Sequence, residues 1–262
     1  MTGRIENKRI LVTGAGSGMG RAIALSLASE GARLTLFDLN EVAAKTVAEE
    51  IAGNGGQAIV VAGNVTERSD VAAAVQASVD EYGGIDVLFA IAGIIKPMHF
   101  LDVTEENWRT TLDINGLGSL ICQQEVAKAM IAQGTGGKLV LTSSIAGRQG
   151  YPNFVPYSAS KFAVTALVQA AARGLAEHGI TCNAFAPGVV DTPLWKKLDL
   201  DLMELGDSKA PGEAFSEFSS GILLGRPGTA DDVTGTALYL ASADSDYMTG
   251  QIIMIDGGMV LV

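Results

Sequence analysis

The chain has 262 residues, 48% of them hydrophobic, and a formal net charge of −11 at pH 7. This length and apolar content suit one α/β domain with a sizeable core, covering residues 1–262. The acidic balance argues against nucleic acid and acidic membrane surfaces as partners, and no apolar run approaches the ~20 residues of a membrane span. The two histidines, His99 and His178, lack metal-ligand spacing, so no metal site is expected.

Apolar segments typical of strands alternate with helical segments along the chain. The predicted strands are Arg9–Thr13, Arg33–Asp38, Gln57–Ala62, Val87–Ile91, Lys138–Thr142, Thr181–Phe185 and Gln251–Ile255. The predicted helices lie near Gly18–Ser29, Glu41–Ala52, Arg68–Tyr82, Glu106–Ala132, Pro156–Glu177 and Ala230–Leu240. The strands are nearly continuous Val, Ile and Leu runs, as expected for strands covered on both faces. With right-handed crossovers, this order predicts a Rossmann fold: a doubly wound, seven-stranded parallel sheet with helices on both faces.

A glycine-rich turn, Thr13–Gly20, joins the first predicted strand to the first helix. Because Gly14, Gly18 and Gly20 have no side chains, the backbone can approach a pyrophosphate at the helix N-terminus. Asp38 ends the second strand about 20 residues on. Its carboxylate can accept hydrogen bonds from both adenosine ribose hydroxyls and would repel a 2′-phosphate, which favours NAD over NADP.

Tyr157 and Lys161 lie four residues apart, so they share one helix face. A free phenol titrates near ~10, and lowering that pKa to about 7 takes roughly 4 kcal/mol. One ammonium at ~4 Å supplies about that much at an effective dielectric of about 20. The pair can therefore transfer a proton, although an exposed helix pair is the alternative. Ser144 follows the strand Lys138–Thr142, at the sheet edge where ligands bind.

These motifs, in this order and with Asn115 upstream of them, resemble the short-chain dehydrogenase/reductase family over essentially the whole chain. The resemblance implies hydride transfer between a secondary alcohol and a nicotinamide cofactor. It makes Tyr157 the general base or acid. Lys161 lowers the pKa of that phenol and binds the nicotinamide ribose, Ser144 holds the substrate oxygen, and Asn115 positions a water between Lys161 and solvent.

The resemblance also extends the cofactor site. Asn64 stands where the family usually has Asp beside the adenine, and Ala90 stands where it has Asn, which puts sheet order and adenosine affinity in doubt. Thr192 and the Val190 backbone are expected to hold the nicotinamide carboxamide. The predicted cofactor-binding residues are Gly14, Ser17, Gly18, Met19, Gly20, Asp38, Leu39, Asn64, Val65, Ala92, Gly93, Tyr157, Lys161, Pro187, Gly188, Val190 and Thr192.

The sequence restricts the identity of the substrate less than it restricts the identity of the cofactor. The segment from Asp191 to about Arg226 breaks the strand–helix alternation and is predicted to be a helical flap over the site. The predicted substrate residues are Ser144, Ile145, Gln149, Phe154, Tyr157 and Trp195. Gln149 and Asn153 could bind a second hydroxyl. The segment Pro187–Leu198 resembles the branch of the family that acts on sugar alcohols, acetoin and 2,3-butanediol, so a polyol, vicinal diol or hydroxyketone is expected.

Two alternatives remain open. A 3-oxoacyl-(acyl carrier protein) reductase would need basic residues to dock an acidic carrier, and the acidic balance disfavours it. A non-catalytic nucleotide-binding scaffold would not need the Asn115, Ser144, Tyr157 and Lys161 set.

Location and assembly follow from composition and resemblance. Cys122 and Cys182 lie in apolar elements and are expected to be buried, reduced thiols. The N-terminus shows no signal peptide, so a cytoplasmic protein is expected. The resemblance implies a homotetramer that packs the helices Glu106–Ala132 and Pro156–Glu177. The apolar C-terminus, Met259–Val262, fits a buried interface.

Overall fold

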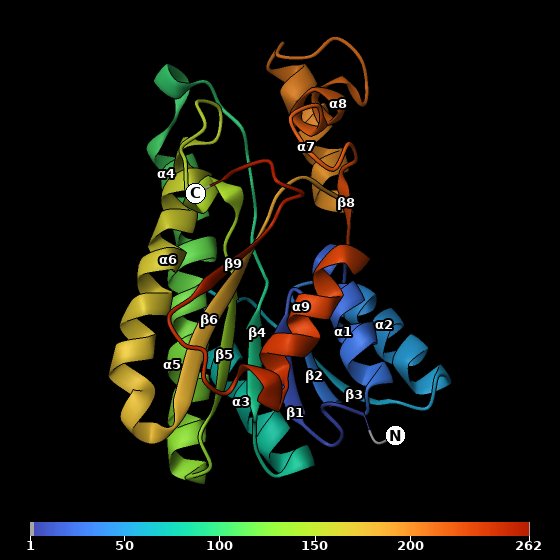
Figure 1. Ribbon diagram of the computed structural model, residues 1–262, viewed down its shortest axis with the longest axis vertical. Coiled ribbons are helices and arrows are strands. Elements are labelled where there is room, and N and C mark those ends of the chain that lie inside the picture. Colours follow the sequence, from blue (N-terminus) through green and yellow to red (C-terminus); the bar gives the residue numbers. More distant parts are fainter. Residues whose placement is uncertain (1–2, 262) are drawn as a thin grey trace.

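The computed structural model describes residues 3–261 and places a seven-stranded sheet at the centre of the protein (Figure 1). Its strand order is β3-β2-β1-β4-β5-β6-β9, and every pairing in it is parallel. The strands are β1 (Arg9–Thr13), β2 (Arg33–Asp38), β3 (Gln57–Ala62), β4 (Val87–Ala90), β5 (Gly137–Thr142), β6 (Ile180–Pro187) and β9 (Ile252–Ile255). The predicted doubly wound sheet is confirmed, with strand bounds that differ by no more than two residues.

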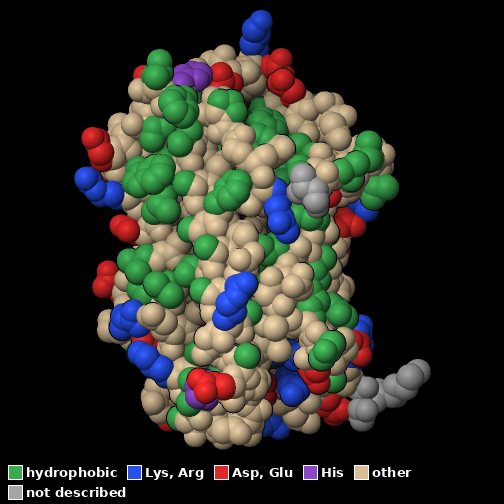
Figure 2. Space-filling view, turned by 60° about the vertical axis from the view of Figure 1, so that its left-hand side comes forward, with side chains coloured by type: hydrophobic (Ala, Val, Ile, Leu, Met, Phe, Trp, Pro, Cys, Tyr) green, Lys and Arg blue, Asp and Glu red, His purple; other side chains and the backbone are tan. Residues whose placement is uncertain are grey.

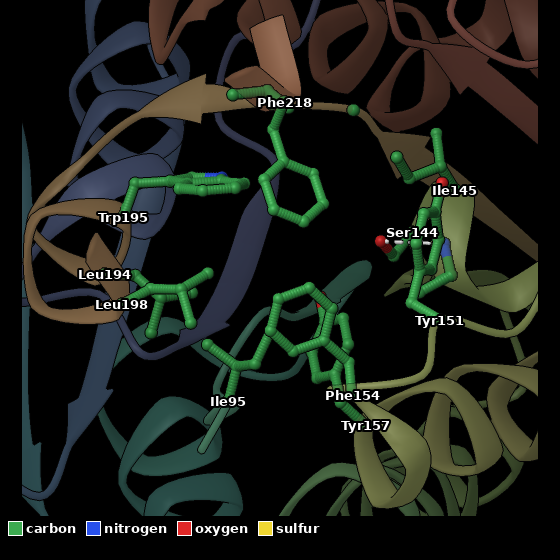
Figure 3. Close-up of a pocket in the computed structure, with 13 residues that line it drawn as sticks. Ile95, Ser144, Ile145, Tyr151, Phe154, Tyr157, Leu194, Trp195, Leu198 and Phe218 are labelled. Carbon is green, nitrogen blue, oxygen red and sulfur yellow. Dashed lines mark hydrogen bonds between the residues drawn. The ribbon is translucent and has the colours of Figure 1, made fainter. Parts of the chain in front are cut away.

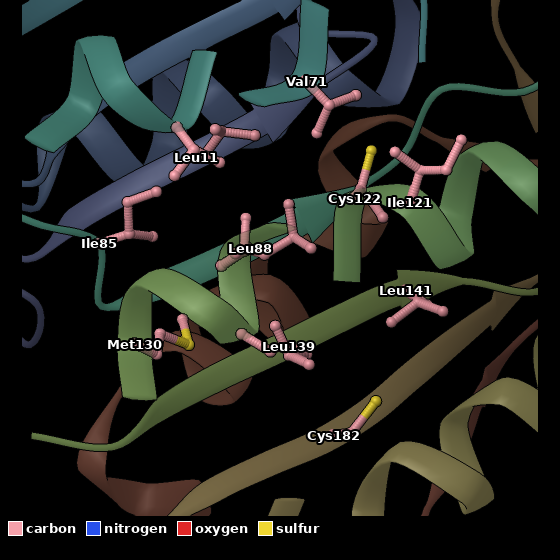
Figure 4. Close-up of a cluster of buried hydrophobic side chains, with 14 of the residues drawn as sticks. Leu11, Val71, Ile85, Leu88, Ile121, Cys122, Met130, Leu139, Leu141 and Cys182 are labelled. Carbon is pink, nitrogen blue, oxygen red and sulfur yellow. The ribbon is translucent and has the colours of Figure 1, made fainter. Parts of the chain in front are cut away.

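Helices cover both faces of the sheet and enclose two apolar cores. One face carries α1 (Gly18–Ser29), α2 (Glu41–Gly53) and α9 (Asp231–Ala241). The other carries α3 (Arg68–Tyr82), α5 (Gly118–Gln133) and α6 (Val155–Leu175), whose core is shown in Figure 4. Cys122 and Cys182 are buried in this second core as free thiols, as predicted. Between residues 3 and 261, no helix is both long and apolar enough to cross a membrane.

The predicted helix Glu106–Ala132 is interrupted. The structure has α4 (Glu105–Leu112), a π-helical turn at Asp113–Leu117, and then α5. Glycine permits close packing where the turn ends, since a Cβ on Gly118 would lie 2.8 Å from Cγ2 of Val65. The wider turn contains Asn115, so the interruption coincides with a predicted site residue, as π-helical turns often do.

The segment predicted as a flap contains two short helices, α7 (Pro193–Glu204) and α8 (Glu213–Ser219), which stand beyond the carboxyl edge of the sheet (Figure 1). Its two ends are tied together by a small parallel pair, β7 (Val190–Asp191) and β8 (Gly228–Thr229). The buried carboxylate of Asp199 on α7 accepts from the backbone N–H groups of Gly212 and Phe215, which holds α8 against α7.

The C-terminal residues differ in exposure within one protomer, and the interface expected to bury them stays a prediction. Val260 is buried, whereas Leu261 is exposed. Val262 lies outside the described residues.

Candidate active site

The glycine-rich turn is built by backbone segments that approach more closely than a side chain would allow. A Cβ on Gly20 would lie 2.0 Å from the carbonyl oxygen of Gly14. Gly14 itself has φ 66°, and its Cβ would lie 2.9 Å from Cα of Ala92. Ser17 is the N-cap of α1 but makes no side-chain cap bond. The first amides of α1 therefore remain available to an anion such as a pyrophosphate.

Backbone amides fix the carboxylate of Asp38 beside this turn. Its Oδ2 accepts from Gly16 N at 2.8 Å, and its Oδ1 accepts from Asn40 N at 2.8 Å. Leu39 follows and is 77% exposed, so an apolar side chain occupies the rim next to the carboxylate. These contacts hold the carboxylate at the groove, where it suits a ribose diol and opposes a phosphate.

The departure at Ala90 does not leave the sheet edge disordered. Ala90 is buried in the core, and the Thr13 hydroxyl oxygen accepts from the N–H groups of Ile91 and Ala92 at 3.0 and 3.2 Å. Thr13 thus fixes the loop after β4. Asn64 is held in a local turn, since its Oδ1 accepts from Thr66 N at 3.1 Å.

All the predicted cofactor residues line one depression at the carboxyl edge of the sheet. Its outer groove encloses about 1270 Å³, counted out to open solvent. Predicted residues that line this groove are Gly14, Ser17, Gly18, Met19, Gly20, Asp38, Leu39, Asn64, Val65, Ala92, Gly93 and Thr192. Those that line the adjoining inner pocket are Met19, Gly93, Tyr157, Lys161, Pro187, Gly188, Val190 and Thr192. The residues present fit an extended dinucleotide.

Ser144, Tyr157 and Lys161 converge on this inner pocket. Ser144 follows β5, and its Oγ accepts from Ala146 N at 3.1 Å, which begins the 3₁₀ turn Ile145–Gly147. Pro156 lies in the first turn of α6 and starts the helix that carries Tyr157 and Lys161 on one face. The Lys161 Nζ lies 5.5 Å from the centroid of the Tyr157 ring and donates to the Thr142 carbonyl at 2.8 Å.

The protein alone does not lower the pKa of the phenol, which differs from the expectation. Burial raises the pKa of Tyr157, and a contact with the Ser144 hydroxyl opposes that rise only in part. Burial also lowers the pKa of Lys161 to about 8. Desolvation disfavours both charged forms, and it outweighs the attraction between them in the absence of a further charge.

The buried ammonium of Lys161 has a consequence for stability. Its pKa is 10.5 ordinarily and about 8 in the fold, so the folded state is penalised below pH 8 and the penalty disappears as pH rises to about 10.5. We expect Lys161→Met to raise the free energy of unfolding at pH 7 by about 1–3 kcal/mol, with no difference near pH 10.5. Urea melts of the cofactor-free protein at both pH values measure this, with the exposed Lys45→Met as control. A less stable Lys161→Met protein at pH 7 would mean that the Thr142 carbonyl compensates the charge.

The side chain of Asn115 forms its hydrogen bonds with other groups of the protein. Its side-chain amide accepts from Ile94 N at 2.8 Å and donates to the Ile94 carbonyl at 2.9 Å and to Ser160 Oγ at 3.0 Å. Ser160 Oγ in turn donates to the Tyr157 carbonyl at 2.7 Å. Asn115 therefore links the loop after β4 to α6, and its predicted water between Lys161 and solvent remains a prediction.

A second pocket opens beyond Ser144 and Tyr157 (Figure 3). Ile145, Phe154 and Trp195 line it, as the sequence predicts. Gln149 does not line it; its Nε2 donates to the Tyr151 hydroxyl at 2.6 Å and its side chain is exposed. Lining residues that the prediction missed are Ile95, Tyr151, Leu194, Leu198 and Phe218. The i, i+4 spacing of Leu194 and Leu198 on α7 was a usable signal for an inward apolar face.

Comparison with known proteins agrees with this geometry. A family model described as enoyl-(acyl carrier protein) reductase matches residues 14–260. A diacetyl reductase [(S)-acetoin forming] of Staphylococcus epidermidis is 39% identical over 97% of this chain and 99% of its own length. The chain belongs to the short-chain dehydrogenase/reductase family. A galactitol 2-dehydrogenase of Agrobacterium fabrum is also 39% identical, over 97% of this chain and 98% of its own length. The family prediction is confirmed.

Solved structures of short-chain dehydrogenase/reductases share the whole fold. The crystal structure of levodione reductase superposes with a TM-score of 0.90 at 32% identity, covering 97% of this chain and 98% of that chain. A structure described as a putative NAD(P)-dependent gluconate 5-dehydrogenase from Beutenbergia cavernae, with bound NADP at low occupancy, gives 0.86 at 34% identity and covers 97% of each chain. The relatives therefore support a nicotinamide cofactor without fixing whether it is phosphorylated.

Proposed function

We propose that this protein transfers a hydride between NAD and a secondary alcohol or its ketone, with a polyol, vicinal diol or hydroxyketone as the substrate class. The observation that carries the proposal is the position of Ser144 and Tyr157. Both line the inner end of the dinucleotide groove and also the second pocket, so they stand between a cofactor site and a substrate site. The names of the two 39%-identical relatives, a diacetyl reductase and a galactitol dehydrogenase, support the substrate class.

The side chains have separate tasks in this reaction. Ser144 Oγ donates a hydrogen bond to the substrate oxygen and stabilises charge on it. Tyr157 takes the alcohol proton during oxidation and returns it during reduction. When bound, the oxidised cofactor supplies the hydride acceptor and a positive charge beside the phenol. Lys161 adds its own ammonium on the same side, which favours the phenolate that burial alone disfavours.

Asp38 is proposed to select NAD. We expect Asp38→Ala combined with Leu39→Arg to lower the ratio of kcat/KM for NAD to that for NADP by about 100-fold or more. The double variant removes a carboxylate that accepts from a ribose hydroxyl and adds a cation for a 2′-phosphate, each worth roughly 1.5–3 kcal/mol. Steady-state kinetics with both cofactors measure the ratio, and Leu39→Arg alone separates the two contributions. A wild-type protein that already prefers NADP would overturn the assignment of Asp38.

The assembly and the flap belong to the same proposal. Apolar side chains gather on the face formed by α4, α5 and α6 (Figure 2), where Trp108, Ile131 and Phe162 are each more than 40% exposed. This face supports a homotetramer, and a monomeric mass by light scattering would contradict it. The helices of the segment 191–226 would cover the bound substrate as a flap. A cytoplasmic location fits the two reduced thiols.

The proposed reaction is tested by measuring reduction of the cofactor through the absorbance of the reduced nicotinamide at mildly alkaline pH. Substrates are 2,3-butanediol, galactitol and a β-hydroxyacyl thioester, each with NAD and with NADP. We expect reduction of NAD by at least one of the first two. Activity with the thioester alone would indicate a 3-oxoacyl reductase instead. Binding of NAD without reduction by any of them would leave the fold and the cofactor site intact and would contradict the proposed substrate class.

A further inference from the structure

The pocket beyond the catalytic pair is walled by aromatic rings. Tyr151 and Phe154 come from the segment before and at the start of α6, Trp195 from α7 and Phe218 from α8 (Figure 3). The ring centroid of Phe218 lies 5.5 Å from that of Trp195, 5.7 Å from that of Phe154 and 6.5 Å from that of Tyr151. These separations are typical of packed aromatic pairs, so the rings support one another around the hollow.

Few polar groups face this space. Within residues 3–261, no charged side chain and no amide side chain lines the pocket, and its side-chain polar groups are Ser144, Tyr151, Tyr157 and the Trp195 indole N–H. Ser144 and Tyr157 are used by the reacting oxygen. The Tyr151 hydroxyl oxygen accepts from Gln149 Nε2, so the Tyr151 O–H and the Trp195 indole N–H are the side-chain donors that remain. Asn153 is turned to Asp207, to which its Nδ2 donates at 2.6 Å. Further hydroxyls on a substrate would therefore find few partners here.

The wall is also preformed rather than a loose lid. Phe154 is 5% exposed, and Leu198, Leu202 and Ala214 are buried with it in a small apolar cluster. The Asp199 carboxylate keeps α8, and hence Phe218, in place on α7. The space counted in the pocket is about 490 Å³, which includes open solvent at its mouth. A polar substrate would thus have to enter an apolar space that is already shaped.

We propose that this pocket selects secondary alcohols and ketones whose remaining carbons are apolar, such as alkyl- or ring-bearing vicinal diols and hydroxyketones, and rejects polyols. The proposal rests on the proposed function, because it names the part of that substrate class that this site accepts. Each buried hydroxyl left without a partner weakens transition-state binding by about tenfold or more. An apolar tail of the same length gains from contact with the rings.

The first experiment compares substrates of equal chain length. With NAD, 2,3-hexanediol is expected to be oxidised with a kcat/KM at least about 100-fold higher than galactitol, which corresponds to two unpaired hydroxyls. A second pair, 1,2-cyclohexanediol and myo-inositol, repeats the comparison with the same six-membered carbon ring and a different number of hydroxyls. Equal kcat/KM values for the apolar diol and the polyol of each pair, or a higher kcat/KM for galactitol, would overturn the inference while leaving the proposed function standing.

Two variants of Phe218 separate polarity from shape. Phe218→Gln adds an amide to the wall, and Phe218→Leu is a smaller apolar control of similar size to Gln. We expect the glutamine variant to reduce the hexanediol-to-galactitol ratio of kcat/KM by about tenfold, and the leucine variant to change that ratio by less than about threefold. If both variants change the ratio equally, ring shape rather than apolarity decides, and the inference fails.

A binding readout keeps the inference testable even if no substrate turns over. The chain has two tryptophans, so Trp108→Phe leaves Trp195 as the fluorescent reporter inside the pocket. In the Trp108→Phe/Tyr157→Phe protein, 2,3-hexanediol should change the emission of Trp195 at concentrations at least about tenfold below those needed for galactitol. Tighter binding of galactitol would overturn the inference. Selective hexanediol binding without any turnover of wild-type protein would refute the proposed function alone.

Discussion

Replacing Tyr157 with phenylalanine is expected to lower kcat by roughly 10²–10⁴-fold, the usual contribution of a positioned proton-transfer group. The change removes one hydroxyl from the place where the proposed cofactor groove meets the second pocket, and it leaves the ring. The Kd for NAD should therefore change by no more than about threefold. Steady-state rates with 2,3-butanediol, together with a fluorescence titration of NAD, measure both quantities.

The control for Tyr157 is Tyr247→Phe, because Tyr247 is fully exposed and contributes to neither pocket. It should match the wild type in rate and in NAD binding. A Tyr157→Phe enzyme that keeps more than about a third of the wild-type kcat would remove Tyr157 from the chemistry. Loss of NAD binding in that variant would instead point to a structural role for the hydroxyl.

Two helical glycines are expected to respond in opposite directions to the same substitution. In Gly20→Ala the new Cβ would lie 2.0 Å from the Gly14 carbonyl oxygen, so the turn must open. We expect a loss of about 1–3 kcal/mol in the free energy of unfolding from overpacking. We also expect a Kd for NAD raised about 10- to 100-fold, the equivalent of one hydrogen bond to a charged group.

Gly235 in α9 is the matched position, because it is exposed and a Cβ added there would have no atom within 4 Å. Gly235→Ala should raise the free energy of unfolding by about 0.5–1 kcal/mol, the helix-propensity difference, with unchanged NAD binding. Chemical denaturation and calorimetric titration of the three proteins provide the comparison. Normal NAD binding by Gly20→Ala would contradict the assignment of the turn to the pyrophosphate.

The sheet, and the gathering of the predicted cofactor residues in one groove, could be predicted from the sequence because both depend on local patterns. Continuous apolar runs locate strands that are buried on both faces. The groove depends on glycines and on Asp38, whose positions follow directly from the ends of β1 and β2. These features need no knowledge of which distant side chains meet.

The pocket beyond Ser144 and Tyr157 could be predicted only in part, because its wall is assembled from distant segments. Phe218 reaches the pocket through the packing of α8 on α7, which depends on the Asp199 carboxylate and two backbone amides. No pattern around Gln149 distinguishes a residue that faces the pocket from one that supports Tyr151 from outside. The π-helical turn at Asn115 was missed for a similar reason, since helical periodicity continues on both sides of it.

The pKa of Tyr157 also depends on tertiary structure. The spacing of Tyr157 and Lys161 indicates an attractive interaction, but only burial of both groups shows that desolvation is larger. The pKa of Tyr157 is therefore expected to be lowered by the positively charged nicotinamide ring of a bound oxidised cofactor rather than by the protein alone.

Hydride transfer to the cofactor is tested most directly by following the hydrogen on the carbinol carbon of the substrate. 2,3-Butanediol deuterated at both carbinol carbons is incubated with NAD and the wild-type protein, and the reduced cofactor is examined by NMR. We expect the wild type to place one deuterium on C4 of the nicotinamide ring, and Tyr157→Phe to do so at least about 100-fold more slowly. Reduced cofactor that carries only protium, or NAD that binds and is reduced by no secondary alcohol, would contradict this expectation.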